Sequence, residues 1–403
     1  MRPSVDPVLG SGLSRRTFFR IAAGASAMAS LPIVTEPHLA LAAIPKFADP
    51  NIGIHIDANE NPMGPSEAAR QAILDILPRG GRYLFNMGDE LAGIFAKQEG
   101  LNPEWVVPFD GSSAPLHYTV LAFTTRDRPL VVADPGYEAP TWAAQVSGAP
   151  VLKVPLADPG GEAIHDVKAM LAAASNPGVM YVCNPNNPTG TVTPQADIEY
   201  LVANAPKDTV ILIDEAYIHL SDAPPSLHFV KEGRNVIVLR TFSKLYGMAG
   251  LRMGFAVGRP DLLAKIVPLG GQNPLPITAM TAAKASLLDP DLVPSRKKTI
   301  AGIRTETIAW LKSQGYATTP SDSNCFMLNV RRPGAEVQAA LAAKQMFVGR
   351  IWPAWPTSLR ITVGTQDEML AFRKAFTQVM SASTASFTPP RRGLAHPPFP
   401  HFS

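Results

Sequence analysis

Seven short apolar segments alternate with helical patterns between residues 105 and 258, and this alternation limits the possible folds more than any other feature. The segments are rich in Val, Ile and Leu without strict polar–apolar alternation, which is typical of strands buried on both faces. The expected strands are 105–108, 130–133, 151–154, 179–183, 210–214, 235–239 and 253–257, and the expected helices lie near 113–124, 137–147, 164–174, 194–204 and 223–231. The pattern predicts a three-layer α/β fold with a large, mostly parallel sheet between helices.

The pattern changes after residue 260 and predicts a second, smaller α+β domain. Its expected helices are 277–288, 294–313, 335–344 and 368–381, and its expected strands are 324–330 and 359–363. The predicted division of the chain is 1–42 as an export signal, 43–80 as an N-terminal arm with part of the small domain, 81–290 as the large domain, 291–383 as the C-terminal small domain and 384–403 as a disordered tail.

Composition excludes several classes of protein. A hydrophobic share of 46% in 403 residues can bury a large core, which excludes wholesale disorder. A net charge of +3 gives no reason to expect nucleic acid as a partner. The two cysteines, Cys183 and Cys325, are too few for a disulfide scaffold or a four-cysteine zinc site, and we expect buried free thiols and no metal.

The first 42 residues have the order of an export signal. Arg15 and Arg16 precede a weakly apolar stretch at 21–34, and Ala40 and Ala42 form a small-x-small cleavage pattern. The paired arginines resemble a twin-arginine (Tat) signal, which implies the Tat machinery as a partner, cleavage near Ala42 and a periplasmic protein. The alternative is an amphipathic helix packed on the body of the protein.

Four polar clusters follow or interrupt predicted strands. They are 184–190 (Asn-Pro-Asn-Asn-Pro-Thr-Gly), 214–217 (Asp-Glu-Ala-Tyr), 241–252 (with Lys244 and Arg252) and 359–364 (with Arg360). Loops at the carboxyl ends of parallel strands line the ligand crevice of such sheets. Asp214 could bind a metal, a ribose or a protonated ring nitrogen, or could cap a helix. Lys244 could form a Schiff base or simply be solvated, and Arg360 could bind an anion or form a structural ion pair.

Taken together, these clusters make the chain resemble the fold-type I aminotransferases that use pyridoxal 5′-phosphate (PLP), and within them the histidinol-phosphate aminotransferase branch. The resemblance covers about residues 50–380 and includes Asp57-Ala-Asn-Glu-Asn-Pro62 and Arg82-Tyr83. It implies the PLP-transferase fold, with residues 81–290 as the PLP-binding domain. It also implies an amino donor and a 2-oxo acid as small-molecule partners.

The resemblance assigns five residues to the cofactor ring. Lys244 is the Schiff-base lysine and proton carrier, and Asp214 pairs with the pyridine nitrogen. Asn187 and Tyr217 bond the ring oxygen, and Tyr137 stacks on the ring face.

The resemblance also assigns the anion-binding groups. Ser112 and Ser113 at a helix start, with Ser243 and Arg252, cradle the cofactor phosphate. Tyr83 reaches the phosphate of a neighbouring subunit, which implies a homodimer with shared active sites.

The substrate side of the site is expected to be cationic. Arg360 clamps the substrate carboxylate or phosphate, Asn187 also faces the substrate, and Arg350 is a further candidate. Arg350 begins a specificity loop that is shorter than in typical histidinol-phosphate enzymes and contains Trp352 and Trp355. The tryptophans either line an aromatic pocket or pack the small domain.

The leading hypothesis is a PLP-dependent aminotransferase with ping-pong kinetics. The alternative on the same fold is a PLP-dependent amino-acid oxidase or decarboxylase, because the cofactor-binding residues do not decide which bond breaks. A non-enzymatic exported binding protein is disfavoured because Lys244 is present. A nicotinamide dehydrogenase is disfavoured because no Gly-x-Gly-x-x-Gly follows the first strand.

Overall fold

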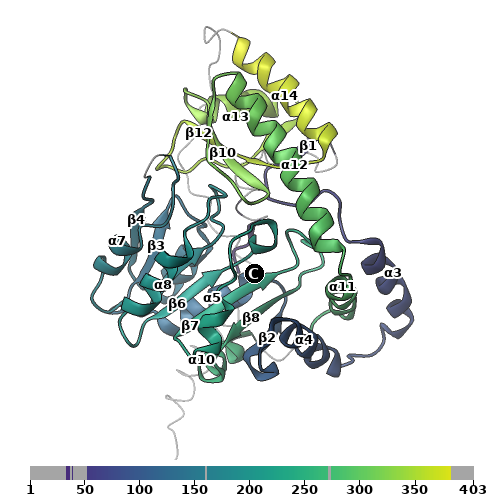
Figure 1. Cartoon of the computed structure of the whole chain (residues 1–403), viewed down its shortest axis with the longest axis vertical. Helices are drawn as coiled ribbons and strands as arrows, with labels where there is room; N and C mark the ends of the chain where they lie inside the picture. Colours follow the sequence, from purple (N-terminus) through teal and green to yellow (C-terminus); the bar gives the residue numbers. More distant parts are fainter. Residues whose placement is uncertain (1–32, 37–38, 40–51, 159–160, 271–273, 383–403) are drawn as a thin grey trace, which may run out of the picture.

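The computed structural model describes residues 33–36, 39, 52–158, 161–270 and 274–382, arranged as a large and a small domain (Figure 1). Most of the predicted export signal and the predicted tail at 384–403 lie outside the described residues. None of the described helices is both long and apolar enough to cross a membrane. Cys183 and Cys325 are buried free thiols, as expected.

A seven-stranded sheet forms the centre of the large domain, and the predicted α/β class is confirmed. Its strands are β2 (Val106–Phe109), β3 (Leu130–Asp134), β4 (Val151–Pro155), β5 (Val179–Cys183), β6 (Val210–Asp214), β7 (Val236–Thr241) and β8 (Gly254–Gly258). They lie in the order β2-β8-β7-β6-β5-β3-β4. Strand β8 runs antiparallel to both β2 and β7, and the other pairs of neighbouring strands in this sheet are parallel. Every residue of β5, β6 and β7 is buried, which explains why their sequences lack a polar face.

Helices follow most of these strands and cover the sheet (Figure 1). They are α5 (Ser113–Phe123), α6 (Ala139–Ser147), α7 (Val167–Ala172), α8 (Gln195–Asn204), α9 (Leu227–Lys231) and α10 (Pro260–Ile266). Two are shorter than expected. Helix α7 begins only after Asp166, whose carboxylate caps the N–H of Ala169. Helix α9 begins after Pro224-Pro225, since the residue preceding a proline is biased away from helical dihedrals.

The strand order reverses beside β3, and this reversal positions the site. The chain moves from β3 outward to β4 and then returns across β3 to β5. Because parallel crossovers are right-handed, the two connections lie on opposite faces of the sheet, and the loops after β3 and β5 diverge. Ligands of open α/β sheets bind in the crevice that such a divergence creates.

The small domain lies above this edge of the sheet, and the long helix α12 (Leu292–Ser313) leads into it (Figure 1). One sheet has the order β12-β10-β9, with β12 (Ser358–Thr362), β10 (Cys325–Asn329) and β9 (Ala317–Thr318). A second sheet pairs β1 (Ile54–Ile56) with β11 (Met346–Val348). Helices α13 (Gly334–Ala342) and α14 (Gln366–Ser381) complete the domain. Strand β1 therefore joins the N-terminal part of the chain to the small domain.

Two helices that we did not predict pack together with α11 (Ile277–Leu288). They are α3 (Glu67–Ile76) and α4 (Asn86–Glu99). Ser66 caps α3 by accepting from the N–H of Ala69, and Gly100 ends α4 in the left-handed conformation. These terminal signals are present in the sequence, but most residues of α3 are partly or fully exposed.

The packing of α14 gives a matched pair of stability variants. Phe372 is fully buried and Leu370, on the same helix, is 47% exposed. We expect Phe372→Ala to lower the free energy of unfolding by about 3–5 kcal/mol because it leaves a cavity. Leu370→Ala should cost less than about 1 kcal/mol. Urea denaturation measures both, and equal losses would contradict this packing of α14.

Candidate active site

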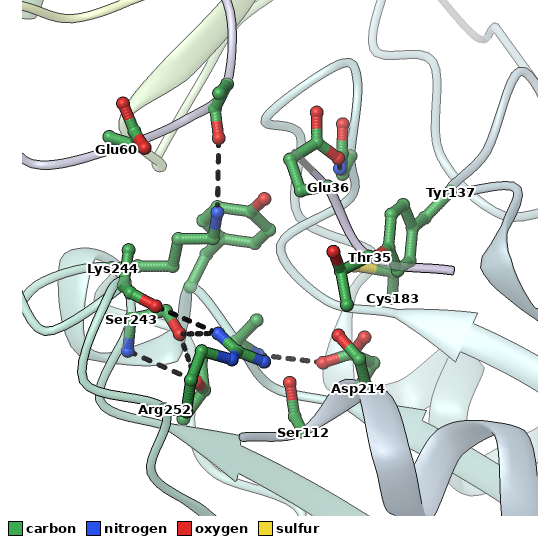
Figure 2. Close-up of a pocket in the computed structure, with 17 residues that line it drawn as sticks. Thr35, Glu36, Glu60, Ser112, Tyr137, Cys183, Asp214, Ser243, Lys244 and Arg252 are labelled. Carbon is green, nitrogen blue, oxygen red and sulfur yellow. Dashed lines mark hydrogen bonds between the residues drawn. The ribbon is translucent and has the colours of Figure 1, made fainter. Parts of the chain in front are cut away.

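One pocket lies at the carboxyl edge of the large sheet and collects side chains from segments far apart in the chain (Figure 2). Nine of the predicted cofactor-binding residues line it. They are Ser112, Ser113, Tyr137, Asn187, Asp214, Tyr217, Ser243, Lys244 and Arg252. Arg360 and Arg350 adjoin the pocket through Asn187 and Glu36, and Tyr83 lies outside its lining.

Lys244 follows β7 in a tight turn and is buried, with 8% of its surface exposed. Its Nζ donates to the carbonyl oxygen of Asn59 at 3.0 Å and lies 5.6 Å from the ring centroid of Tyr217. Burial lowers the pKa of Lys244, although the nearby Glu36 carboxylate opposes this effect. The environment therefore favours a neutral amine, which is the nucleophilic form.

Asp214 ends β6 on the other side of the pocket from Lys244 (Figure 2). Its Oδ2 accepts from the hydroxyl of Tyr181 at 2.9 Å, and its Oδ1 accepts from the N–H of Ala216 at 3.1 Å. Burial raises the pKa of Asp214 to about 6, although both hydrogen bonds favour the ionised form. A carboxylate held in this way is stabilised by a cationic partner placed in the pocket.

An anion-binding cradle forms where α5 begins. Ser112 and Ser113 lie at the N-terminus of α5, where backbone N–H groups attract an anion. The guanidinium of Arg252 donates to Ser243 Oγ at 3.4 Å. Gly111 has a φ of +100°, a conformation that favours glycine, and a Cβ atom added there would contact the guanidinium of Arg252.

Three polar side chains flank the space between Lys244 and Asp214. Tyr137 follows β3, and burial raises the pKa of its hydroxyl. The hydroxyl of Tyr217 accepts from Asn59 Nδ2 at 3.0 Å. Asn187 follows β5, and its Oδ1 accepts from Arg360 Nη1 at 3.0 Å. Asn187 thereby connects the large domain to the small one.

The two arginines form a cationic group in contact with Glu36. Arg360, on β12, is fully buried, and its Nη2 lies 2.6 Å from Glu36 Oε1. Arg350 Nη1 also lies 2.6 Å from Glu36 Oε1, and Arg350 Nη2 lies 2.6 Å from Glu138 Oε2. Asn187 Nδ2 donates to Glu36 Oε2 at 3.3 Å. The arrangement binds one carboxylate from three sides.

Trp352 packs against the two arginines. Its side chain is buried, and its ring centroid lies 4.6 Å from the guanidinium of Arg350 and 5.5 Å from that of Arg360. Its Nε1 donates to the carbonyl oxygen of Gly136 at 2.8 Å. Trp352 therefore supports both arginines, whereas Trp355 is half-buried in the loop that follows.

Tyr83 is 68% exposed, and its ring packs against that of Phe85 with 5.5 Å between centroids. Within this chain the pair lies on the surface and contributes nothing to the pocket lining.

Sequence reasoning missed three polar residues of the site. Glu36 lies within the predicted export signal, Asn59 contacts Lys244 and Tyr217, and Tyr181 supports Asp214. Two of them left a local signal: Asn59 lies in the 57–62 motif that contributes to the resemblance, although no role was assigned to it, and a tyrosine in a fully apolar strand needs a partner for its hydroxyl.

Comparison with known proteins agrees with this geometry. The sequence family described as aminotransferase class I and II matches residues 51–376. The chain belongs to the class I and II aminotransferases. The aminotransferase is 32% identical over 337 residues to histidinol-phosphate aminotransferase of Moorella thermoacetica, covering 81% of this chain and 86% of the relative. It is 33% identical over 328 residues to aromatic amino acid aminotransferase of Mycobacteroides abscessus, covering 80% and 91%.

A solved structure shares the fold. The crystal structure of histidinol-phosphate aminotransferase from Sinorhizobium meliloti in complex with pyridoxal 5′-phosphate superposes with a TM-score of 0.76. It is 26% identical to the aminotransferase and covers 92% of this chain and 98% of its own.

The cofactor of this aminotransferase is PLP, and the pocket fits it. A buried lysine with lowered pKa suits an aldehyde, and a buried carboxylate suits a pyridinium nitrogen. The start of α5 with Arg252 suits a phosphate, and the Gly111 position leaves the room that this cradle needs.

Proposed function

We propose that this PLP-dependent aminotransferase moves an amino group from an anionic amino donor to a 2-oxo acid by a ping-pong reaction at Lys244. The observation that carries the proposal is the pocket that contains Lys244, Asp214, Asn187 and Glu36, together with the paired arginines that contact Asn187 and Glu36 at its edge. When bound, the cofactor supplies an electron sink for the bond that breaks at the donor Cα. The residues of this chain bind, orient and move protons around it.

Lys244 is the proposed proton carrier. Among the residues that the structure describes, its Nζ bonds two carbonyl oxygens, at Asn59 and Ala58, and these accept without competing for its lone pair. Because burial favours the neutral amine, Lys244 can take a proton from the donor Cα and return one on the cofactor side. Asp214 is proposed to keep the ring nitrogen protonated, and Asn187 and Tyr217 to bond the ring oxygen.

Arg360 is the proposed site for the donor's anionic group, with Arg350 beside it. A fully buried guanidinium on an apolar strand needs an anion, and a planar carboxylate can accept from it bidentately. The anion is the carboxylate of an amino acid or the phosphate of a histidinol-phosphate-like amine. The names of the relatives, histidinol-phosphate and aromatic amino acid aminotransferase, support testing these donors first.

We expect Lys244→Ala to abolish the visible absorbance band of the bound cofactor and to lower transamination by at least about three orders of magnitude. The matched control is Lys284→Ala, because Lys284 lies on the surface beside Glu90. Spectra recorded while histidinol phosphate, aromatic amino acids, arginine or glutamate are added singly identify the donor by a single stoichiometric conversion. Transamination by Lys244→Ala, or oxygen uptake or carbon dioxide release by the unaltered enzyme, would contradict the proposal.

We also propose a homodimer with shared active sites. The support is the exposed pair of Tyr83 and Phe85, large aromatic side chains left at the surface of a single chain. In the family that the chain resembles, the tyrosine at this position reaches the cofactor phosphate of the neighbouring subunit.

Mixing the variants Tyr83→Ala and Lys244→Ala tests whether two subunits share their active sites. We expect Tyr83→Ala to weaken PLP binding, because a phosphate ligand from the neighbour is lost. Mixed with Lys244→Ala, it should form heterodimers in which one site has both residues, so activity rises above that of either variant alone. Steady-state assays with light scattering measure this. A monomer, or a mixture with no gain, would contradict the shared site.

Finally, we propose export by the Tat route to the periplasm, with cleavage after Ala42. The support is the order of Arg15-Arg16, the apolar stretch and the Ala40-x-Ala42 pattern. This route carries folded proteins, which suits an enzyme that acquires its cofactor before export.

N-terminal sequencing of the protein from a periplasmic fraction should begin at Ala43. Replacing both Arg15 and Arg16 by lysine should leave the uncleaved chain in the cytoplasm. The control Arg2→Lys should still be exported and cleaved. A full-length chain in the periplasm, or export of the double lysine variant, would contradict this proposal.

A further inference from the structure

The segment 33–36 reaches the active-site pocket through Thr35 and Glu36, although it precedes the proposed cleavage point. The N–H of Val34 donates to His117 Nε2 at 3.1 Å, which fixes the segment to helix α5. Thr35 and Glu36 both line the pocket. Figure 2 shows them between Lys244 on one side and Tyr137 on the other.

The Glu36 carboxylate is bound as a ligand would be. Its Oε1 lies 2.6 Å from nitrogens of both Arg350 and Arg360, and its Oε2 accepts from Asn187 at 3.3 Å. Glu36 is 7% exposed, and among the described residues it is the only carboxylate that pairs with Arg360. Burial would raise the pKa of Glu36, but Arg350, Arg360 and Lys244 lower it to about 2. The carboxylate is therefore ionised across the working pH range.

We propose that residues 33–36 are an intramolecular competitor of the substrate, with the Glu36 carboxylate in the place of the substrate anion, and that cleavage after Ala42 frees the site. This inference rests on the proposed role of Arg360 in binding that anion and on the proposed cleavage after Ala42. The uncleaved chain is thus held in a self-inhibited state until its N-terminal segment is removed.

Exchange of one carboxylate for another explains how the site opens. Withdrawing Glu36 leaves Arg360 with two hydrogen-bond acceptors among the described residues, Asn187 Oδ1 and the carbonyl oxygen of Asp57, neither of which carries a charge. A buried guanidinium without an anion is costly. Arg350 keeps Glu138. An entering substrate carboxylate replaces Glu36 at Arg360, so the two ligands exclude each other.

Because Glu36 is covalently linked to the rest of the chain, it competes for Arg360 more effectively than a free substrate anion does. A tethered group competes at an effective concentration in the millimolar range, which dilution does not change. Cleavage after Ala42 removes the tether, six residues beyond Glu36. The released peptide then diffuses away, and the apparent affinity for a substrate anion rises to its intrinsic value.

The test compares three forms of the full chain loaded with PLP. They are the unaltered chain, Glu36→Gln, and a chain with a protease recognition sequence inserted after Ala42 and cleaved once folded. The probe is glutarate, which has the same carboxylate end as glutamate and no amino or oxo group. Calorimetry measures its binding without turnover. The control is Glu67→Gln, since Glu67 is exposed on α3.

We expect glutarate to bind the cleaved form at least about tenfold more tightly than it binds the uncleaved chain, because cleavage removes the competing segment 33–36. Glu36→Gln should bind glutarate several-fold more tightly than the unaltered chain does. Glu67→Gln should bind it with the affinity of the unaltered chain. With an active donor, cleavage should lower KM and leave kcat unchanged. Hydrogen exchange at residues 33–36 of the uncleaved chain should increase when glutarate is added.

Equal glutarate affinity in all forms would overturn the inference. Weaker binding after cleavage would also overturn it, because Glu36 would then belong to the substrate site. Failure of transamination at Lys244 would leave the glutarate comparison unchanged, so the two proposals fail separately.

Discussion

The hydrogen bonds of Asn59 are the interaction on which the active site depends. Its carbonyl oxygen accepts from Lys244 Nζ and from Asn324 Nδ2, both at 3.0 Å. Its side chain donates to Tyr217 and accepts from Thr362. Asn59 has a φ of +54°, in the left-handed region that asparagine tolerates better than most residues. One residue therefore fixes the reactive amine against both domains at once.

The predictable part of the site follows from the topology of the sheet. Asp214 and Lys244 come directly after apolar strands, and the carboxyl ends of parallel strands meet at one edge, so their proximity can be predicted from local patterns. The missed parts depend on contacts between distant segments. Glu36 is 314 residues from Arg350 and 151 from Asn187, and no periodicity encodes such pairs. Helices α3 and α4 were missed because each gives a weak local signal: α3 fully buries one residue, Ala69, and α4 begins without a side-chain cap.

The loop from Arg350 to Trp355 shows why the presence of two tryptophans could not by itself distinguish an aromatic pocket from packing of the small domain. Trp352 lies against both guanidinium groups and bonds Gly136 in the loop after β3. It packs behind the two arginines and is absent from the pocket lining, so its printed contacts are those of a supporting side chain. A planar indole beside two arginines fixes their orientation at little cost in side-chain entropy.

The proposed competition at Arg360 has a consequence for selectivity. A neutral ligand that displaces Glu36 leaves the fully buried guanidinium without an anion, whereas a carboxylate or phosphate restores the pair. The uncleaved chain therefore excludes neutral amines more strongly than it excludes anionic donors. Arg350 adds less to this discrimination, because Glu138 neutralises it whichever ligand is present. In the proposed function, the requirement for an anionic donor thus resides mainly in Arg360, because its guanidinium is buried on β12.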